Sequence, residues 1–494
     1  MTAADLNVIS PLLAGIATAI AILLVDLALP NRPTPVVFTA LAGLAVTAAV
    51  TLSVGSGVAT SAFVTDGHAM YKLDALTTFL DLLFISIVAM TIVFAPDYLA
   101  PRNLPVAEFA IVLVFAMCGA MVIAASADLL LLFIGLELMV LPGYMLAAYH
   151  KTDGYSTEGA IKYFLLGSFS SAIFLFGLAF VWGLSGSTSI DVVASTLTKV
   201  ATGAAPFSPG LAMGLAFLTT GVAFKIAAVP FHYWTPDAYQ GSPTPVTGYL
   251  SVGPKIGAFA LILRLFAEAL GPMKADWLPV VIVLAATTMT LGNLVALTQD
   301  NVKRMLAYSS IAHTGYMLVG LAAFAGGRSS GLEALLYYGA AYSFMNLGAF
   351  AVIAALQKRA GVTSSLNTFA GLVRREPALT FLMTLFLLSL TGIPPTAGFF
   401  AKFLLIKSAV EAGGWVGFLA VLLVLNAAAA AFYYLRVVVY MFMREPVSEG
   451  PALKHGRLLW SGLAAATVLT IAFGLFPGLI LGMVERAAGA ISGG

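Results

Sequence analysis

Three lysines lie in apolar stretches of this sequence, where charged side chains are rare. Lys225 follows GLAFLTTGVAF, Lys255 follows Gly253-Pro254, and Lys402 follows GIPPTAGFFA. A charge at the centre of a bilayer costs about 2.5–3.5 kcal/mol, so such residues usually serve a function. The nearby prolines and glycines predict interrupted helices, which a membrane tolerates only where the backbone is buried in protein or lines a wet cavity. Together these features predict an internal path for ions, and we expect the ion to be the proton.

A carboxylate lies in another apolar stretch, at Glu137 in DLLLLFIGLELMVLP. The protonation of a lysine in a low-dielectric cavity is sensitive to its surroundings, and a neighbouring carboxylate favours the charged ammonium. We therefore expect Glu137 and Lys225 to form a pair whose proton content responds to nearby charge, as a gated relay requires. The alternative is a static ion pair that only joins two helices. Lys162 lies near the end of its apolar stretch, where it either modulates Lys225 or extends to the interface.

His313, in YSSIAHTGYMLVG, also has apolar neighbours. Because imidazole titrates near neutral pH, this residue is suited to pass protons between groups. We expect a path from Lys225 through Lys255 and His313 to Lys402. The alternative is that His313 is a hydrogen-bonded core residue.

The remaining polar candidates are given structural interpretations. Those nearer the predicted helix ends are weaker relay candidates: Arg264, Lys407 and Arg436. Those in the proline-rich turn after Lys225 are expected to fix its hydrogen bonds: His232, Asp237 and Tyr239. Those in a short loop are expected to form a solvated cluster: Asp300, Lys303 and Arg304.

Composition places the chain in a membrane. Of 494 residues, 60% are hydrophobic and 9% charged, whereas a soluble domain carries about 25% charged residues. The net charge of +2 and the absence of a basic block give no basis for nucleic-acid binding. The single cysteine, Cys118, excludes an intrachain disulfide and a cysteine-rich metal site. The histidines show no spacing typical of metal ligands, so we expect no metal and no cofactor bound by this chain.

Apolar stretches of about 20 residues predict membrane-spanning helices. About fourteen are predicted, forming one all-α polytopic membrane domain over residues 1–494, near 8–28, 36–56, 76–96, 106–125, 128–149, 160–184, 209–230, 245–270, 277–298, 303–324, 331–356, 379–410, 414–443 and 458–484.

The seventh and twelfth predicted spans resemble each other, since each has a lysine and a proline or glycine interruption. Their offset of five spans predicts two five-helix repeats, at 106–270 and 277–443. These repeats follow N-terminal helices at 1–105 and precede a C-terminal loop and helix at 444–494. An odd number of helices per repeat gives the two repeats opposite topologies, with a site near each midplane.

The distribution of basic residues predicts the orientation of the chain. Loops after odd-numbered spans carry twelve lysines and arginines, and the other loops with the C-terminal tail carry five. By the positive-inside rule the first set is cytoplasmic, so both termini are expected on the outer side. Richness in alanine and glycine without an organellar transit segment favours a bacterial inner membrane.

Four motifs resemble the antiporter-like membrane subunits of respiratory complex I, from about residue 100 to 440. They are LELMVLP around Glu137, EGAIKYFLLGSFSSA (158–172), FKIAAVPFHYWTPDAYQGSPTPVTGYLS (224–251) and GIPPTAGFFAKF (392–403). The resemblance implies fourteen helices, inverted five-helix repeats and a transmembrane proton channel. It assigns proton-relay roles to Glu137, Lys225, Lys255 and Lys402.

The resemblance also implies partners. FMN, iron–sulfur clusters and quinone are expected in other subunits of an NADH:quinone oxidoreductase, and neighbouring antiporter-like subunits in its membrane part. Quinone reduction there is expected to drive proton transfer here. Two alternatives are a subunit of a multi-subunit Na⁺/H⁺ antiporter and a scaffold that transports nothing.

Overall fold

The computed structural model describes residues 2–30, 32–55, 57, 59–358, 361–446 and 453–492. Within these residues, eleven helices are long and apolar enough to cross a membrane. They are Ser10–Ala28, Pro33–Gly55, Ala75–Arg102, Val106–Ala125, Leu129–Ala147, Gly154–Ser185, Thr244–Ala269, Gly271–Ala296, Ser330–Leu356, Gly414–Met443 and Arg457–Leu475. The expected all-α multi-pass membrane protein is confirmed. The count of fourteen spans adds shorter or more polar helices and stays a prediction. These are α10 (Pro209–Lys225), α15 (Val302–Ala325) and α18 (Pro377–Thr391) with α19 (Ala397–Ala412).

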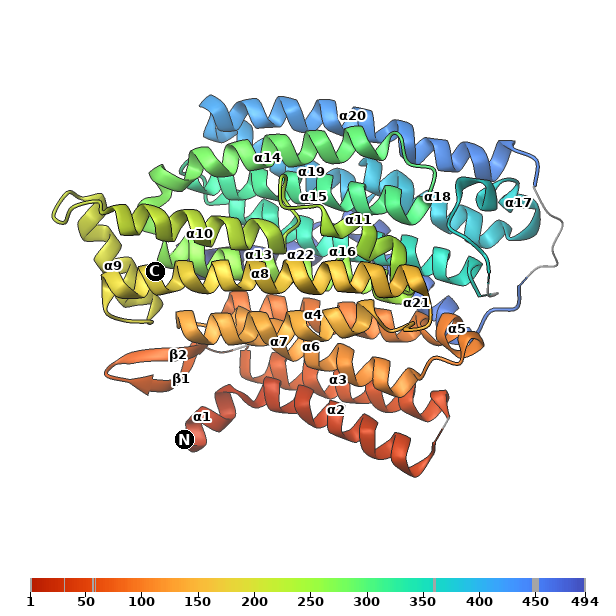
Figure 1. Cartoon of the computed structure of the whole chain (residues 1–494), viewed down its shortest axis with the longest axis horizontal. Coiled ribbons are helices and arrows are strands. Elements are labelled where there is room, and N and C mark those ends of the chain that lie inside the picture. The colour runs from red at the N-terminus through yellow and green to blue at the C-terminus, as the bar shows by residue number, and fades with distance from the viewer. Residues whose placement is uncertain are drawn as a thin grey trace.

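The helices lie side by side along the longest axis of the molecule (Figure 1). At one edge are α2 (Ser10–Ala28) and α3 (Pro33–Gly55), and at the other edge is α20 (Gly414–Met443). The centre holds α15 (Val302–Ala325) and α16 (Ser330–Leu356), whose side chains are almost all buried. Central helices can carry polar groups because other helices shield them from lipid.

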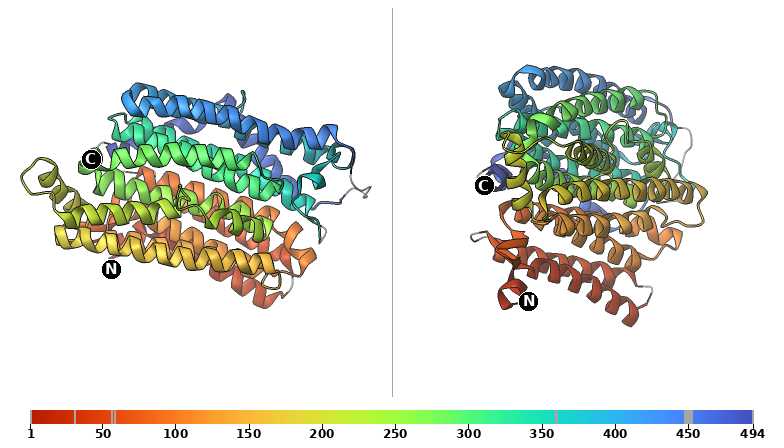
Figure 2. Two further views of the ribbon diagram at one scale, coloured as in Figure 1. Left: turned by 45° about the horizontal axis from the view of Figure 1, so that its top comes forward. Right: turned by 60° about the vertical axis from the view of Figure 1, so that its left-hand side comes forward.

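Further helices in the described ranges belong to the bundle, which Figure 2 shows from two further sides. They are α1 (Ala3–Val8), α4 (Ala75–Phe94), α5 (Pro96–Leu99), η1 (Ala100–Arg102), α6 (Val106–Ala125), α7 (Leu129–Ala147), α8 (Gly154–Ser185), α9 (Ile190–Ala201), η3 (Gly271–Met273), α14 (Lys274–Ala296), η4 (Leu366–Phe369) and α17 (Leu372–Arg375).

Two predicted spans are interrupted where the sequence predicted. The span at 209–230 consists of α10 (Pro209–Lys225), a non-helical stretch and α11 (Trp234–Gly241). The span at 379–410 consists of α18 (Pro377–Thr391) and α19 (Ala397–Ala412). Prolines end these helices because they lack an N–H and restrict the preceding residue.

The eighth predicted span is also built from pieces. It contains α12 (Thr244–Leu250), α13 (Gly253–Ile262) and a π-helical segment, η2 (Leu263–Ala269). Pro254 lies in the first turn of α13, where a missing N–H costs no helical hydrogen bond. This break positions Lys255 at the start of a helix inside the bundle.

The last predicted span was too long. Helix α21 (Arg457–Leu475) ends at the sequence Phe476-Pro477, and α22 (Gly478–Ser492) follows as a separate helix. The proline disfavours helical geometry at the residue before it, so the apolar run 458–484 does not form one helix.

A β-hairpin was not predicted. Strands β1 (Thr60–Thr65) and β2 (His68–Leu73) pair antiparallel, with Thr65 opposite His68. The turn between them, Asp66-Gly67, has φ values of 52° and 82°, as a tight two-residue hairpin requires. Figure 1 shows the hairpin, α9 and both labelled chain ends at one end of the bundle, and α5 and α17 at the opposite end.

Candidate functional site

Lys225 is the last residue of α10, and its ammonium contacts α8. Its Nζ donates hydrogen bonds to Ser171 Oγ at 2.7 Å and to the carbonyl oxygen of Gly167 at 3.4 Å. The two helices approach closely, since a Cβ on Gly221 would lie 2.6 Å from Phe174 Cβ. The half-buried ammonium is therefore held by neutral oxygens inside the bundle.

Glu137 lies on α7 near Lys225 without touching it. Among the described residues no ion pair joins them, and the buried Oε1 of Glu137 has no hydrogen-bond partner. The carboxylate nevertheless interacts electrostatically with Lys225 and with Tyr144 and Tyr163. The predicted pair thus takes the form of two groups that interact electrostatically without a direct hydrogen bond.

A short hydrogen-bonded chain links the end of α10 to Lys255. Thr314 Oγ1 donates to the carbonyl oxygen of Ile226 at 2.9 Å and, as an alternative, to that of Ser310 at 3.2 Å. Lys255 Nζ donates to the carbonyl oxygen and to Oγ of the same Ser310, each at 2.5 Å. Ile226, the residue after Lys225, and the ammonium of Lys255 therefore both contact one turn of α15, from Ser310 to Thr314. Lys255 is only 3% exposed.

His313 lies on the same turn of α15, between Ser310 and Thr314, and has a tyrosine hydroxyl at each ring nitrogen. Tyr338 Oη lies 2.6 Å from Nδ1, and Tyr434 Oη lies 3.2 Å from Nε2. The imidazole interacts electrostatically with both Lys255 and Lys402. His313 thus interacts with both lysines, and its ring lies within a hydroxyl network that was not predicted; its relay role stays a prediction.

Lys402 lies on α19 and closes the end of α18. Its Nζ donates to the carbonyl oxygens of Leu390 at 2.9 Å and Thr391 at 2.7 Å. These are unsatisfied carbonyls at a helix C-terminus, where a positive charge is stabilised by about 0.3–2 kcal/mol. The ammonium also lies 5.2 Å from the centre of the Tyr316 ring.

Hydrogen-bonded amide and hydroxyl groups connect Tyr316 to α20. Asn293 Nδ2 donates to Tyr316 Oη at 2.8 Å, and Tyr433 Oη donates to Asn293 Oδ1 at 3.0 Å. Asn293 also donates to Asn426, which donates in turn to Thr290 at 3.3 Å. These buried groups satisfy one another, which fixes the rings around His313 and Lys402.

Lys162 is a more exposed group at the edge of the site. Its ammonium pairs with Glu158 and with Asp237 of α11, each at 2.7 Å. Asp237 also pairs with Arg304 at 2.7 Å. Lys162 therefore ties α8 to the segment that follows the interruption after Lys225, and does not contact Lys225 itself.

One sequence interpretation needs correction. Lys303 is only 4% exposed and donates to the carbonyl oxygen of Ser242 at 2.5 Å, so it is not part of a solvated loop cluster. Arg264 is fully buried and pairs with Asp74 and Glu268, so it joins elements at a helix end. Tyr239 donates to the carbonyl oxygen of Leu250 at 3.0 Å, as expected for a residue that fixes the turn.

The site combines titratable groups with hydroxyls that accept and donate protons. Sequence reasoning missed the linking residues Ser310, Thr314, Tyr338 and Tyr434. The available signal was the concentration of hydroxyl-bearing side chains in an otherwise apolar span, beginning with Tyr308-Ser309-Ser310. Such side chains need partners inside a membrane, and here those partners are the ionisable groups.

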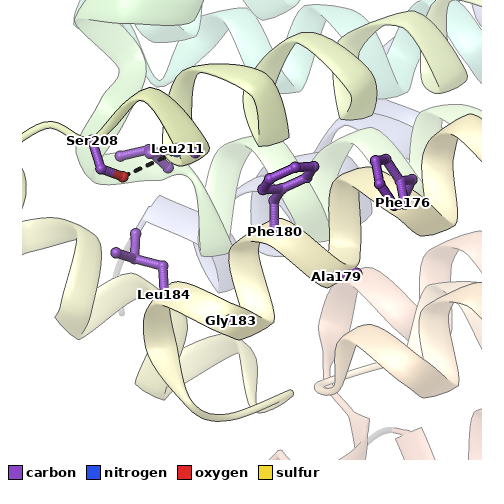
Figure 3. Close-up of a pocket in the computed structure, with 8 residues that line it drawn as sticks. Phe176, Ala179, Phe180, Gly183, Leu184, Ser208 and Leu211 are labelled. Carbon is purple, nitrogen blue, oxygen red and sulfur yellow. Dashed lines mark hydrogen bonds between the residues drawn. The ribbon is translucent and has the colours of Figure 1, made fainter.

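A groove on the surface is apolar, unlike the polar interior around His313. Figure 3 shows a groove between α8 and α10, with a volume of about 420 Å³, lined by Phe176, Phe180 and Leu184. Its polar feature is Ser208, which accepts a hydrogen bond from the Leu211 N–H at 3.2 Å. The groove faces outward with apolar rings, so it offers no constellation for a polar substrate.

Comparison with known proteins defines the class. The family described as NADH:quinone oxidoreductase/Mrp antiporter, TM, matches residues 126–426, which include all six predicted relay residues. The chain belongs to this family of membrane proteins.

Two relatives named NADH-quinone oxidoreductase subunit N confirm the resemblance seen in the motifs. NADH-quinone oxidoreductase subunit N of Trichlorobacter lovleyi is 40% identical over 98% of this chain and 96% of its own length. The protein of the same name from Chloroflexus aggregans is 39% identical over 99% and 98%.

Solved structures share the fold. A chain of respiratory complex I from Thermus thermophilus with bound aureothin superposes with a TM-score of 0.75 and 32% identity, over 96% of this chain and 98% of that one. A chain of the Mrp complex from Dietzia superposes with a TM-score of 0.84 at 23% identity, over 99% and 98%. At 23% identity, the likeness to the Mrp chain shows a shared fold only.

Proposed function

We propose that this chain is a proton-translocating membrane subunit of an NADH:quinone oxidoreductase. One observation carries the proposal: Lys225, Lys255 and Lys402 each lie beside a helix interruption, and with His313 they are hydrogen-bonded to hydroxyls and carbonyls inside the bundle. The similarity to proteins named NADH-quinone oxidoreductase subunit N, at about 40% identity over nearly the whole chain, supports the assignment. FMN, iron–sulfur clusters and quinone belong to partner subunits in this proposal, and neighbouring antiporter-like subunits adjoin this chain.

The mechanism follows from the groups present. Quinone reduction in partner subunits changes the charge or hydration near Glu137, and this alters the proton affinity of Lys225. A proton released from Lys225 passes by water and the Thr314–Ser310 link to Lys255. It then moves through His313 and its tyrosines to Lys402. Moving one charge against 100 mV requires about 2.3 kcal/mol, which corresponds to a change of under two pKa units at about 1.36 kcal/mol per unit.

The repeats and the orientation are part of the same proposal. Residues 106–270 and 277–443 form two inverted repeats, and support comes from the interruption that each contains beside a buried lysine. The end of the bundle with both termini faces the outer side of a bacterial inner membrane. The excess of basic residues in the opposite loops supports this orientation.

The test is proton uptake by inverted membrane vesicles whose complex carries Lys225→Ala. We expect NADH-driven proton uptake to be lost and NADH:quinone activity to fall, while the complex remains assembled. Lys199→Ala is the matched control, because Lys199 is an exposed residue at the end of α9 outside the network. Wild-type uptake in the Lys225→Ala complex would reject the proposal and favour a scaffold.

A second candidate function is supported by the fold shared with the Mrp complex of Dietzia. In that case the chain would serve a multi-subunit Na⁺/H⁺ antiporter. Sodium-dependent proton transport by the wild-type vesicles, without any dependence on NADH, would favour this candidate.

A further inference from the structure

Asp81 is a buried acid that the proposed proton path does not use. It lies in α4, is 0% exposed, and neither carboxylate oxygen has a hydrogen-bond partner among the described residues. An unpaired carboxylate charge in such a place carries a penalty of several kcal/mol. Buried polar groups are nearly always satisfied by protein or by ordered water. Asp81 therefore requires a ligand that supplies hydrogen bonds or a proton.

The surroundings of Asp81 identify that ligand. The carboxyl interacts electrostatically with Asp74, Arg264, the hydroxyl of Tyr71 and the thiol of Cys118. The Tyr71 hydroxyl is buried and also has no hydrogen-bond partner within the described ranges. Asp81 and Tyr71 thus carry three unsatisfied oxygen atoms, from α4 and β2, and the two groups interact electrostatically. A buried water needs two to four polar partners.

A line of polar groups joins Asp81 to the hairpin end of the bundle. Asp74, Thr77 and Asp81 are spaced i, i+3 and i+7, so they share one face of α4. Thr77 Oγ1 donates to Asp74 Oδ1 at 3.0 Å and accepts from Arg264 at 2.9 Å. Because a helix rises about 1.5 Å per residue, Asp81 lies about 10 Å deeper than Asp74.

The line continues from Asp74 to solvent. Arg264 donates to Asp74 at 2.9 Å and to Glu268 at 2.6 Å, and Lys72 Nζ donates to Glu268 at 2.7 Å. The exposed fraction of these side chains rises from 9% at Asp74 to 11% at Glu268 and 26% at Lys72. The two cations balance Asp74 and Glu268, which leaves Asp81 without a counter-ion of its own.

We propose that Asp81 is a proton-binding site that exchanges its proton with the outer face through this line of groups. The Asp81 carboxyl gives its proton to water held with Tyr71. Water hydrogen-bonded to Thr77, Asp74 and Glu268 carries it to solvent beside Lys72, and the Asp81 carboxylate is reprotonated by the reverse steps. Within the described residues no hydrogen bond joins Asp81 to Lys255, His313 or Lys402. The site is therefore separate from the central network, and it exchanges its proton with the outer face alone.

Infrared spectroscopy of the purified complex tests the site directly. We expect the wild type to show the carbonyl band of a buried carboxylic acid that shifts on exchange into D₂O, and the isosteric Asp81→Asn complex to lack it. Glu268→Gln should make the exchange of that band about tenfold slower, which corresponds to about 1.4 kcal/mol in the barrier. Asp66→Asn is the matched control, since Asp66 is an exposed residue of the hairpin turn where asparagine is equally suited. The proposal would be overturned if the band were unchanged in Asp81→Asn, or if its rate of exchange were the same in Glu268→Gln as in the wild type.

Proton translocation per NADH separates this inference from the function proposed above. Because both directions of exchange at Asp81 end at the outer face, we expect a wild-type ratio in reconstituted Asp81→Asn complex, with NADH oxidation and assembly retained. A reduced ratio in Asp81→Asn would place Asp81 on the translocation path and overturn its separation from the central network. A wild-type ratio in Lys225→Ala would overturn the proposed function, whatever the infrared result at Asp81.

Discussion

Each buried lysine is held by neutral oxygens and not by a carboxylate. Lys225 contacts a serine hydroxyl and a carbonyl, Lys255 contacts Ser310, and Lys402 contacts two helix-end carbonyls. An ion pair with a direct carboxylate partner would fix the charged form of a lysine, because an opposite charge at close range favours ionisation. Neutral partners leave the protonation of each lysine responsive to distant charge, which is what a relay requires.

Gly392 gives a test of the Lys402 position. Its φ is 93°, and a Cβ there would lie 2.9 Å from Lys402 Cδ. We expect Gly392→Ala to displace the Lys402 side chain from the carbonyls of α18 and to lower proton translocation per NADH in reconstituted complex. Backbone strain alone should cost about 1–2 kcal/mol of stability.

The control separates strain from displacement. Gly327 has a φ of 92° and open space at its Cβ position, so Gly327→Ala imposes similar strain without touching Lys402. We expect it to lower thermal stability similarly and to leave the proton ratio unchanged. Equal ratios in the two variants would contradict the role given to the Lys402 contact.

At the scale of elements, helix ends and interruptions do the positioning. The end of α10 places Lys225, the start of α13 places Lys255, and the end of α18 receives Lys402. Apolar runs with prolines and glycines made these interruptions predictable. The β-hairpin and the split between α21 and α22 were missed because predicting spans by apolar length ignores turn residues such as Asp66-Gly67 and the single Pro477.

The cluster at the start of α4 joins that helix to η2 and to the end of α6. Arg264 donates to Asp74 and also to the carbonyl oxygen of Ala124. Burial alone would raise the pKa of Asp74, but the charge and hydrogen bonds of Arg264, with help from the Thr77 N–H and Lys72, lower it to about 2. Because the folded pKa lies below the ordinary value of 3.8, the stabilisation is complete above that value and is lost as pH falls toward about 2.

Asp74→Asn tests this cluster. Removing one partner of a buried ion pair typically costs about 3–5 kcal/mol, since the other charge remains buried. We expect the detergent-solubilised variant complex to unfold at lower temperature at neutral pH, and to lose less stability than wild type between pH about 4 and about 2, as followed by tryptophan fluorescence. Asp66→Asn should behave as wild type. Equal acid sensitivity in wild type and Asp74→Asn would refute the linkage.

At the scale of the whole molecule, the sequence predicted the protein class and the buried lysines, and the structure supplied their connections. Charged residues in apolar runs are visible in any sequence, so Lys225, Lys255, His313 and Lys402 could be selected. Thr314 and Ser310 could not, because an ordinary hydroxyl becomes part of a path only when packing places it against Ile226 and Lys255. Asp81 was visible as a lone acid in FLDLLF and was overlooked because no proline or glycine marks it.

The prediction that Lys303 lies in a solvated loop cluster was wrong because its burial depends on the whole molecule. It follows Asp300 in a charged run typical of loops, but α15 begins at Val302 and turns this lysine toward α11, where the carbonyl of Ser242 accepts its hydrogen bond. Tertiary contact with a distant segment decided its burial, which local sequence does not report.

In the proposed mechanism, protons driven by NADH oxidation cross this chain by way of its buried lysines, and replacing Lys402 interrupts that route. The measurement is the number of protons translocated per NADH oxidised by purified complex in proteoliposomes, for wild type, Lys402→Ala and Lys407→Ala. Lys407 lies on the same helix with an exposed side chain, so its variant controls for loss of a lysine. We predict a reduced ratio for Lys402→Ala and a wild-type ratio for Lys407→Ala. A wild-type ratio in both would contradict the account.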